Sequence, residues 1–257
     1  MVRIALSLVF GWLILCFPAP GFAHFGMIIP SASMVDRQSR NLGLTMSFSH
    51  PFAQEGMELV KPLHAGVFLE GTMTDLAKDL RKTTVFGHTA WSVNYRVKRP
   101  GVYTFVMEPH PYWEPAEDCF IIHYTKTIVG AFGEEEGWER PAGLKTEIVP
   151  LTRPFGLYAG NVFQGQILLD GKPAPHTPVE IEYYNPHGPM QAPHPYLATQ
   201  VVRADANGVF TVGIPAAGWW GFAGLNTADY QIRQKGTPKD VELGAVLWVE
   251  VVPWPEP

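Results

Sequence analysis

The sequence predicts an all-β protein with two immunoglobulin-like β-sandwich domains. Short apolar runs alternate residue by residue, which is the period of a strand with one buried face. The chain contains 25 Gly and 24 Pro among 257 residues, and these turn-forming residues end each run. In the first half, only residues 76–80 have a spacing that suggests a helical turn. These three observations together favour layered antiparallel sheets.

The first 23 residues have the pattern of a cleaved signal peptide. The run from Ile4 to Phe17 is uncharged, Arg3 precedes it, and the small residues Gly21 and Ala23 stand where signal peptidase requires them. Cleavage after Ala23 would leave His24 as the first residue. We therefore expect an exported protein, although signal peptidase cuts before any residue type and His24 could be incidental.

Composition limits the classes of partner. The formal net charge is −5, and removal of the leader with Arg3 would make the chain more acidic still. An acidic chain argues against a nucleic-acid partner and favours cations as ligands. Cys119 is the only cysteine outside the leader, so an internal disulfide is not expected. No later segment approaches the ~20 apolar residues of a membrane span.

The first domain is expected over residues 24–150. The segment from Leu42 to His50 alternates cleanly, so His50 should end a strand on its apolar face. Later in this domain, a proline-rich loop is expected over residues 108–119, and it leads into a strand that carries His123. Further strands are expected over the following ranges: 65–70, 89–98 and 102–108.

The second domain is expected over residues 151–257, after a connection at 130–154. Turn sequences such as Asp170-Gly171-Lys172-Pro173 recur at short intervals, as in a seven-stranded sandwich. The expected strands cover the following ranges: 161–169, 179–184, 199–204, 209–214, 218–223 and 244–252.

Histidines of the first domain predict a metal site. An N-terminal His24 would offer its α-amino group and its imidazole in one short chelate, and such nitrogen ligands suit Cu²⁺ or Ni²⁺. His50 and His123 are the expected further ligands, with His88 or His110 as substitutes. Each of these histidines could instead be a hydrogen-bonded structural group.

Carboxylates of the proline-rich loop are the expected companions of these histidines. Glu108, Glu117 and Asp118 could complete the metal's coordination or orient a ligand's second ring nitrogen. Adjacent Ser49 and His50 point to opposite faces of a strand and cannot form a nucleophilic relay. We therefore predict no enzymatic activity, no catalytic residues and no organic cofactor.

Four stretches resemble a particular family of bacterial periplasmic proteins. They are His24-Phe25-Gly26-Met27-Ile28-Ile29-Pro30, Ser47-Phe48-Ser49-His50-Pro51-Phe52, Tyr112-Trp113-Glu114-Pro115-Ala116-Glu117-Asp118 and Gly244-Ala245-Val246-Leu247-Trp248. The family is that of the periplasmic component of nickel and cobalt uptake systems. The resemblance implies a metal-handling accessory of a membrane-embedded importer driven by ATP hydrolysis. The turns and strands of the second half are similar to prealbumin-like sandwich repeats, which imply fold alone.

Two alternatives use the same residues differently. The histidines could hold copper, either in a periplasmic carrier with an N-terminal histidine or in an oxidative enzyme with a two-histidine brace. Alternatively, the protein could be an adhesive or scaffolding sandwich pair in which the histidines are structural.

Overall fold

The computed structural model describes residues 24–255, so the predicted signal peptide, residues 1–23, lies outside the described residues. The described part consists of strands, turns and one short 3-10 helix, η1, over Pro195–Leu197. Within it, no helix is long and apolar enough to cross a membrane. The predicted all-β class is confirmed.

The strands of the first half are β1 (Phe25–Pro30), β2 (Met34–Val35), β3 (Asn41–His50), β4 (Glu55–Met57), β5 (His64–Leu69), β6 (Thr72–Asp75), β7 (Arg81–Val85), β8 (His88–Arg96), β9 (Gly101–Glu108), β10 (Tyr112–Glu114) and β11 (Cys119–Ala131). Those of the second half are β12 (Thr146–Pro150), β13 (Leu157–Tyr158), β14 (Val162–Leu169), β15 (Lys172–Pro173), β16 (Pro178–Tyr183), β17 (Thr199–Arg203), β18 (Val209–Gly213), β19 (Gly218–Thr227), β20 (Ile232–Gln234), β21 (Thr237–Lys239) and β22 (Val241–Val252).

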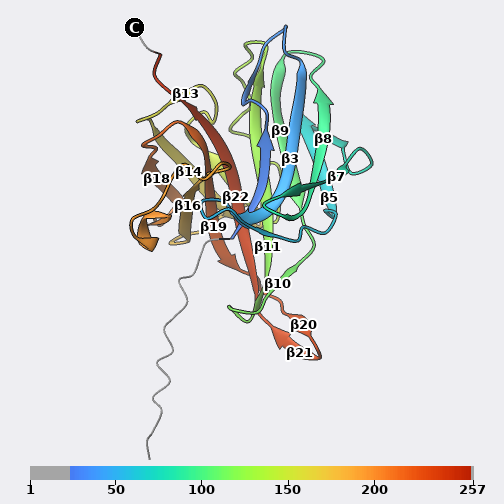
Figure 1. Ribbon diagram of the computed structural model, residues 1–257, viewed down its shortest axis with the longest axis vertical. Helices are drawn as coiled ribbons and strands as arrows, with labels where there is room; N and C mark the ends of the chain where they lie inside the picture. Colours follow the sequence, from blue (N-terminus) through green and yellow to red (C-terminus); the bar gives the residue numbers. More distant parts are fainter. Residues whose placement is uncertain (1–23, 256–257) are drawn as a thin grey trace, which may run out of the picture.

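Three larger sheets and one hairpin make up the fold (Figure 1). The central sheet has the order β17-β16-β19-β22-β11-β9-β5-β6. A front sheet has the order β1-β3-β8-β7, with β4 paired to β3, and a rear sheet has the order β12-β14-β15, with β18 paired to β14. The hairpin β20–β21 projects beyond the sheets, close to β10 (Figure 1).

Alternation along β22 explains why the central sheet is covered on both faces. Val246 and Trp248 pack in one apolar cluster with Phe25 of the front sheet, whereas Leu247 belongs to another cluster with Phe163 of the rear sheet. Successive side chains of a strand point to opposite faces. The front and rear sheets therefore lie on opposite sides of the central sheet.

The two halves of the chain share the central sheet. Strand β11 of the first half pairs in parallel with β22 of the second, in a register that runs from Phe120↔Val241 to Thr127↔Trp248. The domain boundary expected at residue 150 therefore does not coincide with a break between sheets. Each sandwich uses part of the central sheet as one of its layers.

Three segments differ from their expected structure. The expected connection at 130–154 contains β12, which pairs with β14 and is buried throughout. The expected loop at 108–119 contains β10, which pairs with β11. Residues 76–80 form a hydrogen-bonded turn instead of a helical one, with the Asp79 N–H donating to the Leu76 carbonyl at 3.0 Å. In the first two cases, the structure is determined by pairing with a distant strand, which local patterns do not encode.

A buried ion pair connects β11 to β12 on the rear face of the central sheet. Lys126 Nζ lies 2.5 Å from Glu147 Oε2, and the side chains are 0% and 2% exposed. Glu147 also accepts hydrogen bonds from the N–H groups of Ala142 and Gly143, at 2.9 and 2.8 Å. Burial lowers the pKa of Lys126, and the carboxylate opposes that shift. The pair therefore holds the segment before β12 against the sheet.

Candidate functional site

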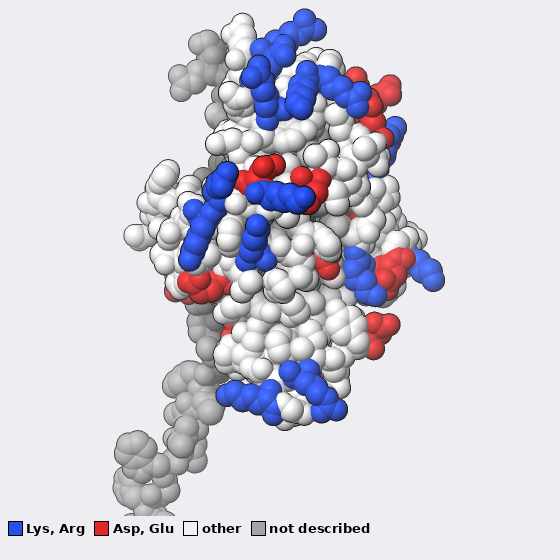
Figure 2. All heavy atoms as spheres, turned by 90° about the vertical axis from the view of Figure 1, so that its right-hand side faces the viewer, with Lys and Arg blue, Asp and Glu red and all other residues white. Residues whose placement is uncertain are grey.

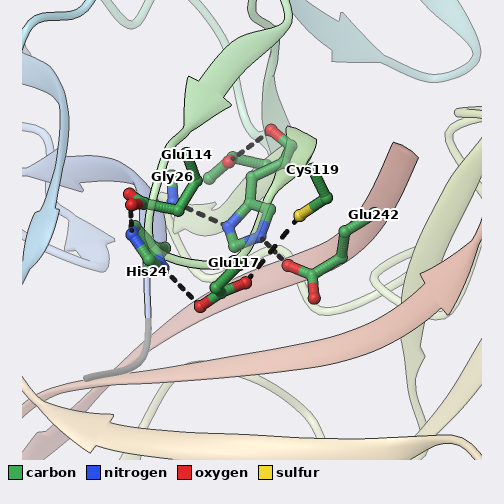
Figure 3. Close-up of polar contacts among 8 residues, drawn as sticks. His24, Gly26, Glu114, Glu117, Cys119 and Glu242 are labelled. Carbon is green, nitrogen blue, oxygen red and sulfur yellow. Dashed lines mark hydrogen bonds and ion pairs between the residues drawn. The ribbon is translucent and has the colours of Figure 1, made fainter. Parts of the chain in front are cut away.

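His24 lies immediately before β1 and is almost fully buried, with 8% of the residue exposed. Its Nε2 is 2.9 Å from Glu114 Oε2, and its Nδ1 is 3.7 Å from Glu117 Oε1. The imidazole lies between these two carboxylates of the β10 region (Figure 3). Only the first distance is that of a hydrogen bond. The contact with Glu114 therefore fixes the orientation of the His24 ring.

The pKa of His24 is lowered from 6.5 to about 4. Burial is the largest cause, and the nearby His50 and His123 rings add to it, while Glu114 acts in the opposite direction. The ring is therefore neutral at neutral pH. A neutral ring that donates its Nε2 proton to Glu114 leaves Nδ1 as the nitrogen with a lone pair.

His50 ends β3, as the alternating pattern predicts, and its ring lies beside that of His24. The ring centroids are 4.5 Å apart, with an interplanar angle of 53°. Phe48, on the same face of β3, stacks on His24 at 5.8 Å and meets His123 edge-on at 5.6 Å. His24 and His123 thus contact one aromatic ring, that of Phe48, and His50 lies beside His24.

His123 is buried and has both ring nitrogens engaged. The Gly26 N–H donates to Nδ1 at 3.2 Å, so the proton of the neutral ring is on Nε2, which faces Glu242 Oε1 at 3.4 Å. His123 therefore connects β1 of the front sheet to β22 of the central sheet. In this arrangement neither of its nitrogens presents a lone pair toward His24.

Two glycines make room for the His123 ring. A Cβ at Gly244 would lie 2.3 Å from His123 Cδ2, and one at Gly26 would lie 2.9 Å from His123 Cβ. Both distances are far below van der Waals contact. Glycine at these two positions is thus what permits the imidazole to lie between β1 and β22.

The second half of the chain contributes carboxylates to the same region. Glu242, at the start of β22, faces His123, and Glu180 of β16 is close enough to Glu242 and Glu117 to interact with both. Burial first, and then these two carboxylates, raises the pKa of Glu180 to about 7. The pKa of Glu117 is likewise raised by burial and by Glu242 and Glu114. We refer to three histidines and four glutamates as the cluster: His24, His50, His123, Glu114, Glu117, Glu180 and Glu242. The four glutamates make the cluster rich in negative charge.

Cys119 borders this cluster and is half-buried. Its Sγ is 3.9 Å from Glu117 Oε2 (Figure 3). Burial and the three surrounding glutamates raise the pKa of the thiol to about 12. The thiol is therefore protonated at neutral pH and is a poor nucleophile and a poor ligand in this state.

The two substitute histidines do not join the cluster. His88 Nδ1 lies 3.0 Å from the Phe86 carbonyl oxygen within its own hairpin. His110 is exposed and lines a cavity of about 40 Å³, which His123 also borders. In residues 24–255, no hydrogen bond or ring contact links either residue to His24.

Of the three expected carboxylates, only Glu117 lies beside a histidine of the cluster. Glu108 instead contacts His64 at 4.0 Å and the Tyr124 hydroxyl at 3.5 Å. Asp118 forms an ion pair with Lys239 at 2.5 Å. Glu114, which the prediction omitted, makes the closest contact with His24.

Side chains alone do not form a metal-binding geometry in the described residues. Between residues 24 and 255, no three His, Cys, Asp or Glu side chains are arranged so that they could hold a metal ion. The predicted ligand set of His24, His50, His123, His88 and His110 is therefore not assembled by its imidazoles. What the structure assembles is a pair of adjacent imidazoles, His24 and His50, with Glu114 and Glu117 beside His24.

Charge outside the cluster is mixed in sign. On the face shown in Figure 2, Lys and Arg gather at both ends of the molecule, and acidic and basic side chains alternate between them. No continuous basic surface of the kind that binds nucleic acid covers this face.

Solved structures give only a distant likeness. The D0–D1 domain of intimin is 10% identical over 90% of this chain and 100% of that one, with a TM-score of 0.25. A trypsin-activated alpha-2-macroglobulin from Escherichia coli is 9% identical over 91% of this chain and 16% of that one, with a TM-score of 0.28. The fibronectin(III)-like modules of Clostridium thermocellum CbhA are 8% identical over 88% and 95%, with a TM-score of 0.21. The fold assignment therefore rests on the strands and sheets described above.

Sequence comparison identifies the family but no function. No curated protein matches the chain. One family model, described as a domain of unknown function, DUF4198, matches residues 21–228. The match covers most of the chain, including every residue of the cluster except Glu242. The chain belongs to the DUF4198 family.

Proposed function

We propose that this protein binds a divalent transition-metal ion, nickel or cobalt, in the periplasm and delivers it to a membrane-embedded importer driven by ATP hydrolysis. The observation that carries the proposal is the orientation of His24. Glu114 binds Nε2, and burial keeps the ring neutral, so Nδ1 is the nitrogen left to coordinate a metal. The metal ion is the cargo of the protein in this proposal.

Cleavage after Ala23 would give that nitrogen a second donor. The α-amino nitrogen and Nδ1 of one histidine can close a single chelate ring around a metal ion, whereas an amide nitrogen at the same place is a poor donor. The His50 ring, 4.5 Å from that of His24, supplies the next imidazole. The two imidazoles and the α-amine together make three nitrogen donors. The third donor therefore comes from the backbone and does not have to be a side chain.

The other cluster residues have supporting roles in this proposal. Glu114 orients a ligand through the ring nitrogen that does not bind the metal, a common arrangement in metal sites. Glu117, Glu180 and Glu242 provide negative charge that favours a cation. His123 holds β1 in place through Gly26 and does not coordinate the ion.

The choice of cargo and compartment rests on sequence. Nitrogen donors select late first-row metals over Mg²⁺ or Ca²⁺, and affinity alone would favour Cu²⁺. The signal-peptide pattern supports the periplasm, and the resemblance to nickel and cobalt uptake proteins supports those metals and the importer as partner. A copper carrier is the alternative that uses the same His24 donors.

Calorimetric titration of Ni²⁺, Co²⁺ and Cu²⁺ tests the proposal. The protein should begin at His24, and the comparison protein should carry one extra glycine before His24. We expect the extension to weaken binding at least tenfold, because it converts the α-amine into an amide. His50→Ala should also weaken binding, and His110→Ala is the matched control that should not.

Three results would contradict the proposal. Equal affinity of the extended and native forms would exclude the N-terminal chelate. Absence of binding by the processed protein would leave the histidines structural. Tight binding of Cu²⁺ with no measurable binding of Ni²⁺ or Co²⁺ would favour the copper carrier.

A further inference from the structure

We propose that Glu182 and Asn185, from the second half of the chain, are positioning residues that fix His50 beside His24. The structural part of this inference depends only on the contacts below. Its consequence for metal binding rests on the proposed function.

The turn that follows His50 is held by three hydrogen bonds from these two residues. The Asn185 N–H donates to the Pro51 carbonyl oxygen at 3.2 Å, and Asn185 Nδ2 donates to the Phe52 carbonyl oxygen at 3.1 Å. The Phe52 N–H donates to Glu182 Oε2 at 3.2 Å. Since proline has no N–H, these bonds occupy every backbone polar group of residues 51–52.

Both anchoring residues are themselves firmly placed. Each is 1% exposed. Glu182 lies in β16, which pairs with β17 and β19, and it also accepts a hydrogen bond from the Thr199 hydroxyl. Asn185 binds Met190 at both its carbonyl oxygen and its N–H, at 3.0 and 3.3 Å. A buried, hydrogen-bonded carboxylate and amide of this kind are costly to displace.

This anchoring matters because His50 is the last residue of its strand. On one side, β1 pairs with β3 in the register Phe25↔Ser49, which brings His24 next to the end of β3. On the other side, the chain leaves the strand through Pro51, and the contacts with Glu182 and Asn185 set the path of that exit. The spacing of the His24 and His50 rings thus depends on residues more than 130 positions away in the sequence.

The inference predicts that changes in the second half alter a site formed in the first. Supporting residues outside the ligand sphere typically change metal affinity by about 10–100-fold when they are mutated. We expect losses of that size for Asn185→Ala and Glu182→Gln. Neither variant removes a proposed metal ligand.

The experiment has a metal-free and a metal-bound readout. In metal-free protein, a nuclear Overhauser effect between the ring protons of His24 and His50 reports their proximity. In Cu²⁺-loaded protein beginning at His24, electron paramagnetic resonance counts the coordinating nitrogens. Asn226→Ala is the matched control, because Asn226 makes comparable bonds to the hydroxyls of Thr146 and Thr177, away from residues 51–52. Unfolding midpoints verify that all the variants fold.

We expect Asn185→Ala and Glu182→Gln to lose the His24–His50 Overhauser effect and one nitrogen coupling, as His50→Ala does, while Asn226→Ala keeps both. If the two variants keep the wild-type Overhauser effect, the positioning inference is wrong. If the Overhauser effect behaves as expected but the wild-type protein binds no metal, the proposed function fails and the positioning of His50 stands.

Discussion

The two faces of β11 carry buried polar groups that are only three residues apart and that differ in kind. Lys126 on the rear face is fully buried and paired with Glu147, which also accepts two backbone N–H groups. His123 on the front face adjoins the rings of His24 and His50 and glutamates that are partly exposed, such as Glu117 and Glu242. The rear pair balances its charges and stabilises the fold, whereas the front cluster keeps the Nδ1 lone pair of His24 and excess negative charge. The difference distinguishes a structural polar group from a candidate binding site.

Removing the rear cation should have the largest effect. Lys126→Ala leaves the buried Glu147 carboxylate without its counter-charge, and breaking a buried pair in this way costs about 3–5 kcal/mol. Urea denaturation measures the loss. The control is Lys145→Ala, which breaks the exposed pair with Asp170 and should cost less than about 1 kcal/mol. Equal losses in the two variants would contradict the structural role assigned to the rear pair.

The front cluster should instead affect how the free energy of unfolding depends on pH. His24 has a pKa of about 4 when folded and 6.5 as its ordinary value. Between pH 6.5 and 4, His24 binds a proton in the unfolded chain but stays unprotonated in the folded protein. The His24 contribution therefore lowers the free energy of unfolding as the pH falls toward 4. The size of this contribution is about 3 kcal/mol. Glu180 acts oppositely: its pKa is raised from 4.5 to about 7, so the folded protein holds a proton that the unfolded chain releases.

The two contributions should therefore offset each other in the wild-type protein. Glu180→Gln should make the free energy of unfolding fall more steeply between pH 6.5 and 4, because the variant lacks the Glu180 contribution that opposes that of His24. His24→Asn should make it fall less steeply or rise. Urea denaturation at several pH values tests both variants. Parallel pH curves for the wild-type protein and His24→Asn would show that the His24 pKa is not lowered by folding.

Crowding the His123 ring should have an intermediate effect. Gly244→Ala places a methyl group 2.3 Å from His123 Cδ2, and overpacking of this kind costs about 1–3 kcal/mol. We also expect weaker metal binding, because His123 holds β1 through Gly26. The matched control is Gly213→Ala in β18, where a Cβ would meet nothing within 4 Å. If both substitutions are tolerated equally, the close packing of His123 against Gly244 is incorrect.

Local sequence predicted the parts of the site that depend on one strand. The alternation of Leu42, Leu44, Met46 and Phe48 placed His50 on the buried face at the end of β3, and the structure has it there. Periodicity reports which face of a strand is buried and does not report which strand lies opposite. The sequence offers His88 and His110 as substitute ligands, but no hydrogen bond or ring contact in residues 24–255 links either of them to His24.

Long-range pairing determined the rest of the site. Glu242 enters the cluster because β22 pairs in parallel with β11, in a register where Phe120 lies opposite Val241. Glu180 enters it because β16 pairs with β19, which pairs with β22. In the sequence alone, Glu242 is recognisable only as a charged residue at the start of an apolar strand, with nothing to indicate that it faces His123. Gly244, in the next position on the same face, has a role that is apparent only once it is paired with His123. Such pairings also explain why the two sandwiches share one sheet.

The smallest expected effect comes from a charge beside the cluster. Lys239 forms an ion pair with Asp118, next to Glu117, and Asp118 is 67% exposed. Lys239→Gln should change the free energy of unfolding by less than about 1 kcal/mol. If a divalent metal ion binds near His24, loss of this positive charge should raise its affinity about fourfold at low salt, since a divalent ion and a unit charge ~10 Å apart in water interact by about 0.8 kcal/mol. The gain should disappear at high salt, which screens such distances. Titration of Ni²⁺ at two salt concentrations measures it, and an affinity that falls in the variant would mean that Lys239 supports the cluster by packing and does not act through its charge.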